Sequence, residues 1–466
     1  MSLMVSISGI RGVVGESLTP EIIVKYVAAY AEYCNRGTIV VGRDGRITGK
    51  SVADIVTSTL LQAGCNVIFI GVCPTPTVQL AVEQLHAAGG ISITASHNPM
   101  QWNGLKFMAS TGMFLNAEEN KKFWAIAERG DFHFAAWDKQ GKLEQDATWI
   151  DRHIQNIISL PYINLEAVRS KKFKVVVDCD NAAGCVIIPK LLRQFECRII
   201  PLNCELTGIF SHTPEPIPEN LTQLASKVVE EKADLGIAVD PDVDRLVLIN
   251  EKGEPFVEEY TIASAVNFVL KKEQELGRKN QPQGGLQRVV VNLSTTRAVD
   301  DIAAQFSATV VRTPVGEINV AAKMKEIGAV VGGEGSGGVI LREVHLGRDA
   351  MVGIGLFLQF LTEFGGKTSE LKASLPQYII VKNKIELGLL QADVILKKLH
   401  EKYSRTEKTN SDDGLKIDFA ASWVHLRKSN TEPIIRIIAE AKTRDEADQL
   451  VEQFKKEVLL QGSFQQ

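Results

Sequence analysis

An acidic turn in the sequence has the composition of a cation site. The stretch DPDVDR places Asp240, Asp242 and Asp244 at alternate positions. Carboxylates this close repel one another unless a positive charge lies among them, and oxygen ligands suit Mg²⁺ or Ca²⁺ better than Zn²⁺. An EF-hand is excluded, because its sixth position requires glycine and is Arg245 here, and because LGIAV and RLVLIN on either side read as strands. We predict a Mg²⁺ site with few protein ligands; a solvated acidic turn is the alternative.

A second stretch, TASHNP (Thr94–Pro99), places Ser96 beside His97 directly after the apolar stretch GGISI. A hydroxyl next to an imidazole is a possible activated nucleophile. The alternative is a turn in which Ser96 and Asn98 bond their own backbone and Pro99 blocks the next helix. On these residues alone the turn is the favoured interpretation, and the nucleophile is the competing hypothesis.

A glycine-rich stretch, VVGGEGSGGVIL, surrounds Glu334 and Ser336. The glycines let the backbone come close to a ligand, and the carboxylate accepts hydrogen bonds from hydroxyl groups. The pattern therefore suits a sugar, although glycine-rich turns are common without one.

Near the C-terminus, the stretch RKSNTEPIIR contains groups that bind phosphate. Arg427 and Arg436 bracket three polar side chains, those of Ser429, Asn430 and Thr431. Guanidinium groups, hydroxyls and turn amides suit a phosphate dianion; a basic surface turn is the alternative. Together with the other three stretches, this one indicates phosphoryl transfer on a sugar phosphate.

Three segments that carry these loops repeat a pattern of strand, polar turn, helix and strand. They begin with TIVVGRDGR (38–46), KVVVDCDNAAG (174–184) and RVVVNLSTTRA (288–298). Each continues with a helix-like stretch and a second β-branched run, which is typical of mostly parallel sheets. The last segment instead combines an amphipathic stretch, short strands and a final helix.

We therefore predict an α/β fold with three tandem α/β domains, which have mixed, mostly parallel sheets, and a smaller α+β domain at the C-terminus. The predicted domains cover residues 1–155, 156–254, 255–370 and 371–466. Each of them contains one of the four polar loops.

Composition excludes several classes of protein. The chain has 466 residues, of which 45% are hydrophobic and 23% charged, with a formal net charge of −4. Without a long Lys/Arg block, neither nucleic-acid nor membrane-surface binding is expected, and no apolar run approaches the ~20 residues of a membrane helix. The N-terminus lacks the pattern of an export signal. Because the seven cysteines show no CxxC spacing, we interpret them as reduced core residues and expect a cytoplasmic protein.

The four loops, in this order and spacing, resemble those of the α-D-phosphohexomutases. The matching stretches are TASHNPMQWNGLK, DPDVDR, GEGSGG and RKSNTEPIIR, supported by SGIRG, VGRDGRITG, PTPT and HTPEPIPENL, and they extend over essentially the whole chain. The resemblance implies four domains around a central cleft and a serine that carries a phosphoryl group. Ser96 matches that serine, so the resemblance favours the nucleophile over the turn.

The resemblance also implies a mechanism with a small-molecule sugar phosphate as substrate. Phospho-Ser96 gives its phosphoryl group to the free hydroxyl of a hexose 1- or 6-phosphate, and after the resulting 1,6-bisphosphate turns over, Ser96 takes back the other group. One Mg²⁺ per chain is expected as cofactor, with hexose 1,6-bisphosphate as activator. The expected metal ligands are Ser96, through its phosphate, and Asp240, Asp242 and Asp244.

The other roles implied by the resemblance divide into catalysis and substrate binding. Lys106 is expected to exchange protons with the sugar hydroxyl, and His97 to position the serine. The implied catalytic residues are Arg11, Ser96, His97, Lys106 and Arg245. The implied substrate-binding residues are Glu334, Ser336, Arg427, Ser429, Asn430, Thr431 and Arg436.

Departures from the family pattern bear on the sugar. Many bacterial members end the sugar loop in Ser-Gly-His, whereas this chain has Gly338, and His345 and Arg348 in EVHLGRDA are the candidates for the vacated space. Pro241 also replaces a glycine of many members. The sugar loop and the LGRD run favour phosphoglucosamine mutase activity, with phosphomannomutase/phosphoglucomutase as the alternative. A sugar-phosphate phosphatase and a non-catalytic sugar-phosphate-binding protein are more distant alternatives.

Overall fold

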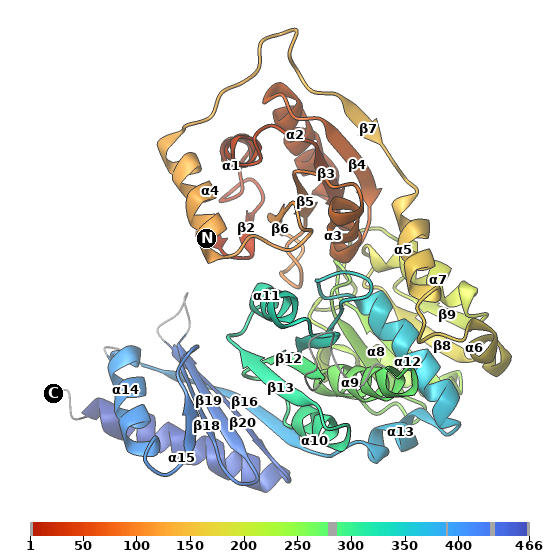
Figure 1. Ribbon diagram of the computed structural model, residues 1–466, viewed down its shortest axis with the longest axis vertical. Helices are drawn as coiled ribbons and strands as arrows, with labels where there is room; N and C mark the ends of the chain where they lie inside the picture. Colours follow the sequence, from red (N-terminus) through yellow and green to blue (C-terminus); the bar gives the residue numbers. More distant parts are fainter. Residues whose placement is uncertain (1–2, 278–286, 388–389, 429–433, 464–466) are drawn as a thin grey trace.

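The computed structural model describes residues 3–277, 287–387, 390–428 and 434–463. Within these ranges the strands form four sheets that follow one another along the chain (Figure 1). No helix in the described ranges has the length and apolarity needed to span a membrane.

The first sheet has the order β1-β2-β6-β5-β3-β4-β7. Its strands are β1 (Met4–Ser6), β2 (Gly9–Val13), β3 (Ile39–Arg43), β4 (Val67–Val72), β5 (Gly89–Ile93), β6 (Trp102–Ala109) and β7 (Leu143–Gln145). The helices of this part are α1 (Pro20–Tyr33), α2 (Gly49–Gln62), α3 (Thr75–Gln84) and α4 (Ala117–Arg129). Every residue of β5 is buried, which explains why GGISI lacks the alternation of a half-exposed strand.

The second and third sheets repeat part of this arrangement. The second contains β8 (Lys174–Asp178), β9 (Arg198–Leu202), β10 (Leu235–Val239) and β11 (Leu246–Asn250). The third contains β12 (Arg288–Asn292), β13 (Thr309–Thr313), β14 (Val331–Glu334) and β15 (Gly338–Leu341). The orders β4-β3-β5-β6, β9-β8-β10-β11 and β13-β12-β14-β15 are equivalent, with two parallel pairs followed by one antiparallel pair.

This repeat places three of the polar loops at equivalent points. The serine loop joins β5 to β6, the acidic turn joins β10 to β11, and the sugar loop joins β14 to β15. Each is therefore the turn of the antiparallel pair in its own sheet, and the predicted α/β fold with mixed, mostly parallel sheets is confirmed.

One hydrophobic core extends through all three of these sheets. It includes Val40 of β3, Val177 of β8 and Val291 of β12. Helix α12 (Ala350–Phe364) is buried on all sides up to Thr362 because AMVGIGLFLQFLT is almost entirely apolar. It contacts α5 (Trp149–Ile158), α6 (Leu165–Lys171) and α9 (Glu258–Glu275) (Figure 1). A shared core holds the three loops in fixed relative positions.

Connecting helices complete this part of the chain. They are α7 (Gly184–Gln194), the short 3₁₀ helix η1 (Pro218–Asn220), α8 (Thr222–Glu230), α10 (Ala298–Gln305), α11 (Glu317–Ile327) and α13 (Thr368–Ser374). Residue 155, the first predicted boundary, falls inside α5, so the chain leaves the first domain as a helix rather than as a polar linker. The domain boundaries remain a prediction.

The C-terminal part forms an antiparallel sheet with the order β16-β20-β19-β18-β17. The strands are β16 (Ile379–Glu386), β17 (Lys408–Asn410), β18 (Leu415–Asp418), β19 (Trp423–Lys428) and β20 (Ile434–Ala441), and the helices are α14 (Ala392–Tyr403) and α15 (Arg444–Ser463). These helices and one face of the sheet share a separate hydrophobic core. The other face contacts the third domain, where Ser294 Oγ lies 2.9 Å from His425 Nδ1 and Glu440 accepts a 2.9 Å hydrogen bond from Arg297 N.

Candidate active site

Ser96 lies in the turn between β5 and β6 in a conformation that serine rarely adopts. Its φ of 50° is in the left-handed region, and its side chain is only 2% exposed. The hydroxyl of Thr94 accepts a 2.9 Å hydrogen bond from the Ser96 amide. Such a conformation persists only where the surroundings enforce it.

Arg46 supplies much of that enforcement. Its guanidinium donates to the carbonyl oxygens of the serine loop at 2.6–2.9 Å, namely those of Ser96, Asn98, Pro99 and Trp102. Asp44 Oδ2, 3.1 Å from Arg46 Nε, neutralises the buried charge. Arg46 is therefore a positioning residue that holds the serine loop through its backbone.

The three aspartates of the acidic turn form a compact, fully buried cluster. One oxygen from each lies within 4.8 Å of the others. Asp240 Oδ1 accepts the amide hydrogens of Asp244 and Arg245 at 3.1 and 3.2 Å. Thr75, at the start of α3, donates its amide to the Asp242 carbonyl at 2.9 Å and its hydroxyl to Asp242 Oδ2 at 2.7 Å. The first domain thus fixes the acidic turn of the second.

The cluster has the chemistry of a hard-cation site. Asp242 Oδ1 and Asp244 Oδ1 are buried and have no hydrogen-bond partner among the described residues, which is costly for a carboxylate unless a cation binds there. Lys106 Nζ supplies a positive charge nearby, at 2.6 Å from Asp242 Oδ2 and 3.3 Å from Asp244 Oδ2. The all-oxygen donor set fits Mg²⁺.

Charges in the cluster shift its pKa values in opposite directions. Burial, together with Asp244 and Asp242, raises the pKa of Asp240 well above its ordinary value. Burial also opposes ionisation of Asp244, but Arg348, Lys106 and Arg245 hold its pKa well below the ordinary range. The carboxylates outweigh the effect of burial on Lys106 and raise its pKa, so this side chain is an ammonium ion here.

Ser96 and the acidic cluster are in direct contact. Ser96 Oγ donates to Asp240 Oδ2 at 3.3 Å and lies 3.3 Å from His97 Nδ1. Burial, with Arg245 and Arg11, lowers the pKa of His97 to about 3, so the imidazole is neutral. Arg11 also contacts the serine loop, because its Nη1 donates to Asn98 Oδ1 at 3.3 Å.

The side chain of Arg245 is 14% exposed, with its Nε 4.0 Å from Asp240 Oδ2 and 3.8 Å from Asp244 Oδ1. The structure therefore brings the six predicted residues of the serine loop and acidic turn together with Arg11 of β2 and Lys106 of β6.

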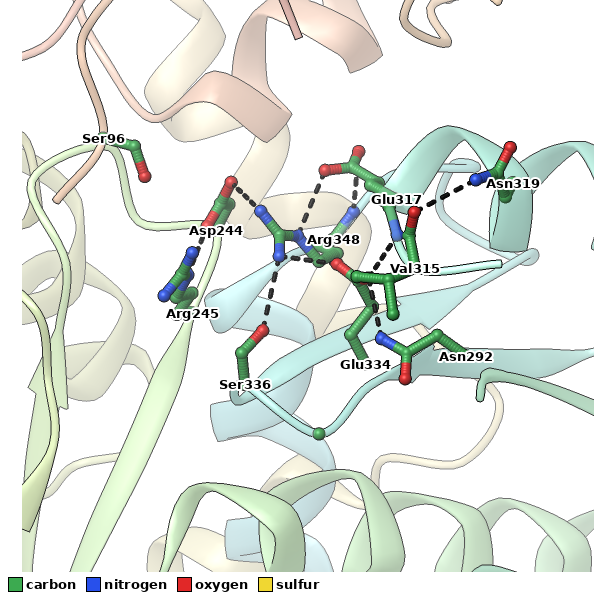
Figure 2. Close-up of polar contacts among 12 residues, drawn as sticks. Ser96, Asp244, Arg245, Asn292, Val315, Glu317, Asn319, Glu334, Ser336 and Arg348 are labelled. Carbon is green, nitrogen blue, oxygen red and sulfur yellow. Dashed lines mark hydrogen bonds and ion pairs between the residues drawn. The ribbon is translucent and has the colours of Figure 1, made fainter. Parts of the chain in front are cut away.

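Arg348 joins the acidic turn to the sugar loop (Figure 2). Its Nη2 lies 2.6 Å from Asp244 Oδ2, and its Nη1 lies 2.8 Å from Glu334 Oε2 and 3.5 Å from Ser336 Oγ. Its Nε donates to Glu317 Oε2 at 3.1 Å. A Cβ at Gly338 would lie 2.2 Å from Arg348 Cδ, so Arg348 occupies the space beside Gly338 and requires glycine there.

His345, the other candidate for that space, lies in a different cluster. His345 Nε2 and His153 Nε2 are 3.2 and 2.7 Å from the same oxygen, Asp349 Oδ2, and Thr77 Oγ1 lies 2.9 Å from His153 Nδ1. Burial opposes the charge of Asp349, but the two histidines hold its pKa below the ordinary range. This buried group connects α3, α5 and the segment before α12.

Of the predicted phosphate-binding residues, Ser429, Asn430 and Thr431 lie outside the described residues. Arg427 and Arg436 belong to β19 and β20, where they are directly opposite each other, and Lys384 of β16 is opposite Arg436 on its other side. Three cations in one row repel one another, and a bound anion would relieve this repulsion. Arg427 Nη2 also pairs with Asp413 Oδ2 at 2.9 Å.

Comparisons with known proteins agree along the whole chain. Models of the phosphoglucomutase/phosphomannomutase family match as alpha/beta/alpha domain I (residues 4–134), domain II (151–253), domain III (261–378) and the C-terminal domain (378–457). The chain belongs to the phosphoglucomutase/phosphomannomutase family. The resemblance to phosphohexomutases inferred from the four loops is therefore confirmed.

Two curated members of the family are similar over nearly their full length. A phosphoglucomutase/phosphomannomutase of Thermococcus kodakarensis is 36% identical, with 95% of this chain and 96% of the relative covered. A protein of Methanopyrus kandleri named "probable phosphoglucosamine mutase" is 35% identical, with 96% of each covered.

Solved structures of the family share the fold. A phosphoglucomutase/phosphomannomutase family protein of Burkholderia thailandensis has a TM-score of 0.83 at 23% identity, with 98% of each chain covered. N-acetylphosphoglucosamine mutase of Aspergillus fumigatus, solved in complex with GlcNAc-6P and magnesium, has a TM-score of 0.62 at 15% identity, with 99% of this chain and 96% of that chain covered.

Several residues that build this mutase-family site were not predicted individually. Arg46 and Thr75 lie in stretches whose resemblance was noted, VGRDGRITG and PTPT, so a signal for them existed. Glu317 and Lys384 lie in no such stretch. Their proximity to the site depends on the pairing of distant segments, which the sequence does not display.

Proposed function

We propose that this chain is a phosphohexomutase that interconverts glucosamine 6-phosphate and glucosamine 1-phosphate through a phosphoserine at Ser96. The observation that carries the proposal is the contact of Ser96 Oγ with Asp240 Oδ2, at 3.3 Å. It places a buried hydroxyl, on a residue with a strained backbone, against a cluster of three carboxylates. A serine that carries a phosphoryl group must lie close to the cation that stabilises the transfer, and Ser96 has this position relative to the carboxylates.

Mg²⁺ is the proposed cofactor, held by Asp240, Asp242, Asp244 and an oxygen of the Ser96 phosphate. When bound, it would neutralise charge that develops on the transferring phosphoryl group. Lys106 contacts the Oδ2 atoms of Asp242 and Asp244 at 2.6 and 3.3 Å, so a cation bound to the same two carboxylates would compete for the negative charge that keeps Lys106 protonated. This competition supports Lys106 as the group that exchanges a proton with the sugar hydroxyl.

The remaining residues have positioning and binding roles in this proposal. His97, neutral and 3.3 Å from Ser96 Oγ, orients the serine, while Arg11 and Arg245 bring positive charge to the transferring group. Glu334 and Ser336 bind sugar hydroxyls. Arg427 and Arg436, with Ser429, Asn430 and Thr431, hold the phosphate that is not being transferred.

The reaction follows from the geometry of the substrate. A phosphoryl group cannot move directly between two distant hydroxyls of one sugar. Phospho-Ser96 therefore donates its group to the free hydroxyl, the hexose 1,6-bisphosphate turns over, and Ser96 Oγ accepts the other group. A 1,6-bisphosphate that escapes would leave Ser96 without a phosphoryl group, which is why added bisphosphate should activate the enzyme.

The choice of sugar rests on the relatives. The name of the Methanopyrus kandleri protein favours glucosamine phosphate, and the Aspergillus fumigatus structure contains the related GlcNAc-6P. The name of the Thermococcus kodakarensis protein supports glucose and mannose phosphates as the alternative. We keep the cytoplasm as the predicted location of the enzyme.

A comparison of substrates tests the proposal. Initial rates should be measured in both directions for the phosphates of glucosamine, mannose and glucose, with Mg²⁺ and hexose 1,6-bisphosphate present. We expect the highest kcat/KM with glucosamine phosphate, loss of activity in chelator, and one phosphate on Ser96 by peptide mapping. A highest value with mannose or glucose phosphate would select the alternative activity.

Two variants separate the mutase from other uses of the same loops. Ser96→Ala should lose mutase activity, and Asp242→Asn should lose its Mg²⁺ dependence together with most of its rate. Wild-type rates in either variant would contradict the site. Release of inorganic phosphate faster than isomerisation would instead indicate a phosphatase.

A further inference from the structure

Three cysteines of the second domain, dispersed in the sequence, come together in the fold. Cys179 follows β8, Cys185 lies in the first turn of α7, and Cys204 follows β9. Cys185 Sγ lies 3.9 Å from the carbonyl oxygen of Asn203, the residue before Cys204, and the three thiols influence one another's ionisation. Cys179 is buried, whereas Cys185 and Cys204 are partly exposed.

The exposed side of this thiol cluster opens into a cavity of about 760 Å³. Cys185 and Cys204 line it together with Cys197, and Lys190 and Arg193 of α7 add positive charge at its wall. Apart from Ile150 of α5, the residues that line the cavity lie in the second domain, and none of them is a predicted site residue. A small molecule can therefore reach the two thiols without entering the active site.

Cys185 and its neighbours differ in protonation. The neighbouring Cys179 and Cys204 thiols, with the backbone amides of Leu206 and Cys185 itself, outweigh burial and hold the pKa of the Cys185 thiol below its usual range. Cys204 stays protonated, with its Sγ 3.2 Å from the Leu202 carbonyl and 3.4 Å from that of Val177. A thiolate next to a thiol is the arrangement that reacts with oxidants.

A metal site fits the cluster less well. Among the described residues, the groups whose ligand atoms all lie within 4.8 Å of one another are the three aspartates and the His153, His345 and Asp349 cluster. The three sulfur atoms are thus less compact than these groups, and a tetrahedral thiolate site requires closer sulfurs.

We propose that Cys185 is a peroxide-reactive thiol and that Cys204 resolves it, which makes this cluster a site of reversible oxidation. The Cys185 thiolate attacks one oxygen of hydrogen peroxide, so an S–O bond forms, the O–O bond breaks, and hydroxide leaves as water after taking a proton. The Cys204 sulfur then attacks the sulfenic sulfur. An S–S bond forms, the S–O bond breaks, and the departing hydroxide takes the Cys204 proton to leave as water. Two thiols lose two electrons and the peroxide gains them.

The loop between Cys179 and Cys185 connects this cluster to the acidic turn. The Ala183 amide donates to the Pro241 carbonyl at 3.2 Å, and Pro241 lies between two of the aspartates. On the other side, Ala182 packs so closely on Gly45 that a Cβ there would lie 2.6 Å from Ala182 Cα. Movement of Cys185 toward Cys204 would strain both contacts. We expect the disulfide to lower mutase turnover, an effect that rests on the proposed function.

Peptide mapping tests the chemistry without any activity assay. The reduced full-length protein is treated with a small excess of hydrogen peroxide, alkylated, and digested without reductant. The expected product is a Cys185–Cys204 disulfide that dithiothreitol reverses. Cys197 is the internal control, because it lines the same cavity while burial raises its pKa to about 12; it should remain alkylated. Equal oxidation of Cys185 and Cys197, or a disulfide between Cys185 and Cys179, would overturn the assignment.

Variants separate the two roles. Cys204→Ser should stop at a Cys185 sulfenic acid that dimedone traps, Cys185→Ser should form no disulfide in the cluster, and Cys197→Ser should behave like the wild type. Oxidised wild-type enzyme should lose mutase activity several-fold and recover it with dithiothreitol. A disulfide without any loss of activity would disprove the link to the acidic turn. If no form of the protein isomerises sugar phosphates, the proposed function fails while the mapping result stands.

Discussion

Arg348 Nη2 lies 2.6 Å from Asp244 Oδ2, so a side chain of the third domain neutralises a carboxylate of the second. The same guanidinium binds Glu334 at 2.8 Å and Glu317 at 3.1 Å. The acidic turn and the sugar loop therefore share one cation, and the charge of either loop affects the other.

Removal of this shared cation should destabilise the protein. Arg348→Ala removes the cation that three buried carboxylates share, and breaking a buried ion pair from one side costs about 3–5 kcal/mol. Arg342→Ala is the control, because Arg342 lies in the same segment but is 42% exposed, and loss of an exposed pair should cost about 1 kcal/mol or less. Denaturant unfolding measures both. Similar losses in the two variants would contradict a shared buried cation.

Arg46 should affect catalysis through the serine loop. Lysine keeps the charge at this position but cannot reproduce a planar fork that reaches several carbonyl groups. We expect Arg46→Lys to lower kcat by a factor of order 10–10³, with a smaller change in KM, because a misplaced nucleophile weakens the transition state more than binding. Arg36→Lys, an exposed change in the same domain, is the control. An unchanged kcat in Arg46→Lys would show that the loop holds its form without this residue.

The candidate site was predictable where its residues are contiguous in sequence. Serine, metal and sugar loops each consist of a few neighbouring residues after a recognisable strand, so both their chemistry and their place at a sheet edge could be inferred. The contacts of Arg348 could not, because Asp244 lies 104 positions away and only the packing of two domains brings them together.

Strand pairing explains why other features of the structure could not be predicted from the sequence. SWVHLRKS predicts a strand that includes Arg427, and β19 agrees. The rest of RKSNTEPIIR is predicted as a loop, yet Arg436 lies in β20, because IIRII is a β-branched strand. The row that Lys384 forms with the two arginines depends on a register that the sequence does not specify. Likewise, the thiol cluster depends on two strand ends meeting the first turn of α7, and the irregular spacing of its cysteines gives no signal of this.

The pair of His212 and Asp178 predicts a pH dependence of stability. His212 Nε2 lies 3.2 Å from Asp178 Oδ2 and its Nδ1 lies 2.8 Å from the Thr213 carbonyl, so both nitrogens face acceptors, as in an imidazolium. Burial lowers the pKa of His212, but Asp178 reverses this and the pKa rises to about 9. The unfolded value is about 6.5.

Because the folded pKa is the higher one, the charged pair stabilises the protein fully below about pH 6.5 and loses this effect as the pH rises through about 9. We expect His212→Gln to be less stable than the wild type by about 1–3 kcal/mol at pH 6, allowing for partial solvent screening. The difference should shrink toward zero near pH 10. Urea unfolding at pH 6, 8 and 10 measures it, and a constant difference across this range would contradict a charged His212.

The basic row of the C-terminal sheet provides the sharpest test of the proposed phosphate-binding role. Arg427 and Arg436 are directly opposite in the β19–β20 pair, and Lys384 extends the row on β16. Asp413 Oδ2 compensates Arg427 in part and also accepts the Val315 amide at 2.9 Å, which connects the row to the third domain. The next residue, Lys428, points to the other face of the sheet and pairs with Asp393 at 2.8 Å. Lys428→Ala therefore removes the same charge from the sheet but leaves the row intact, which makes it the control.

If the row binds the phosphate that is not being transferred, Arg427→Ala should lower kcat/KM by a similar factor for every hexose phosphate. That factor should be of order 10–10³, the equivalent of ~1.5–4 kcal/mol of charge-assisted bonding. The variant should also depend more on added hexose 1,6-bisphosphate, because a weakly held intermediate escapes more often.

Lys384→Ala should have a smaller effect in the same direction, and Lys428→Ala should retain wild-type kinetics. Preference among the phosphates of glucosamine, mannose and glucose should not change, because Glu334 and Ser336 are the proposed contacts of the sugar. A changed preference in Arg427→Ala would show that this arginine contacts the sugar rather than the phosphate. Equal losses of kcat/KM in Arg427→Ala and Lys428→Ala would show that only the net charge of the sheet matters.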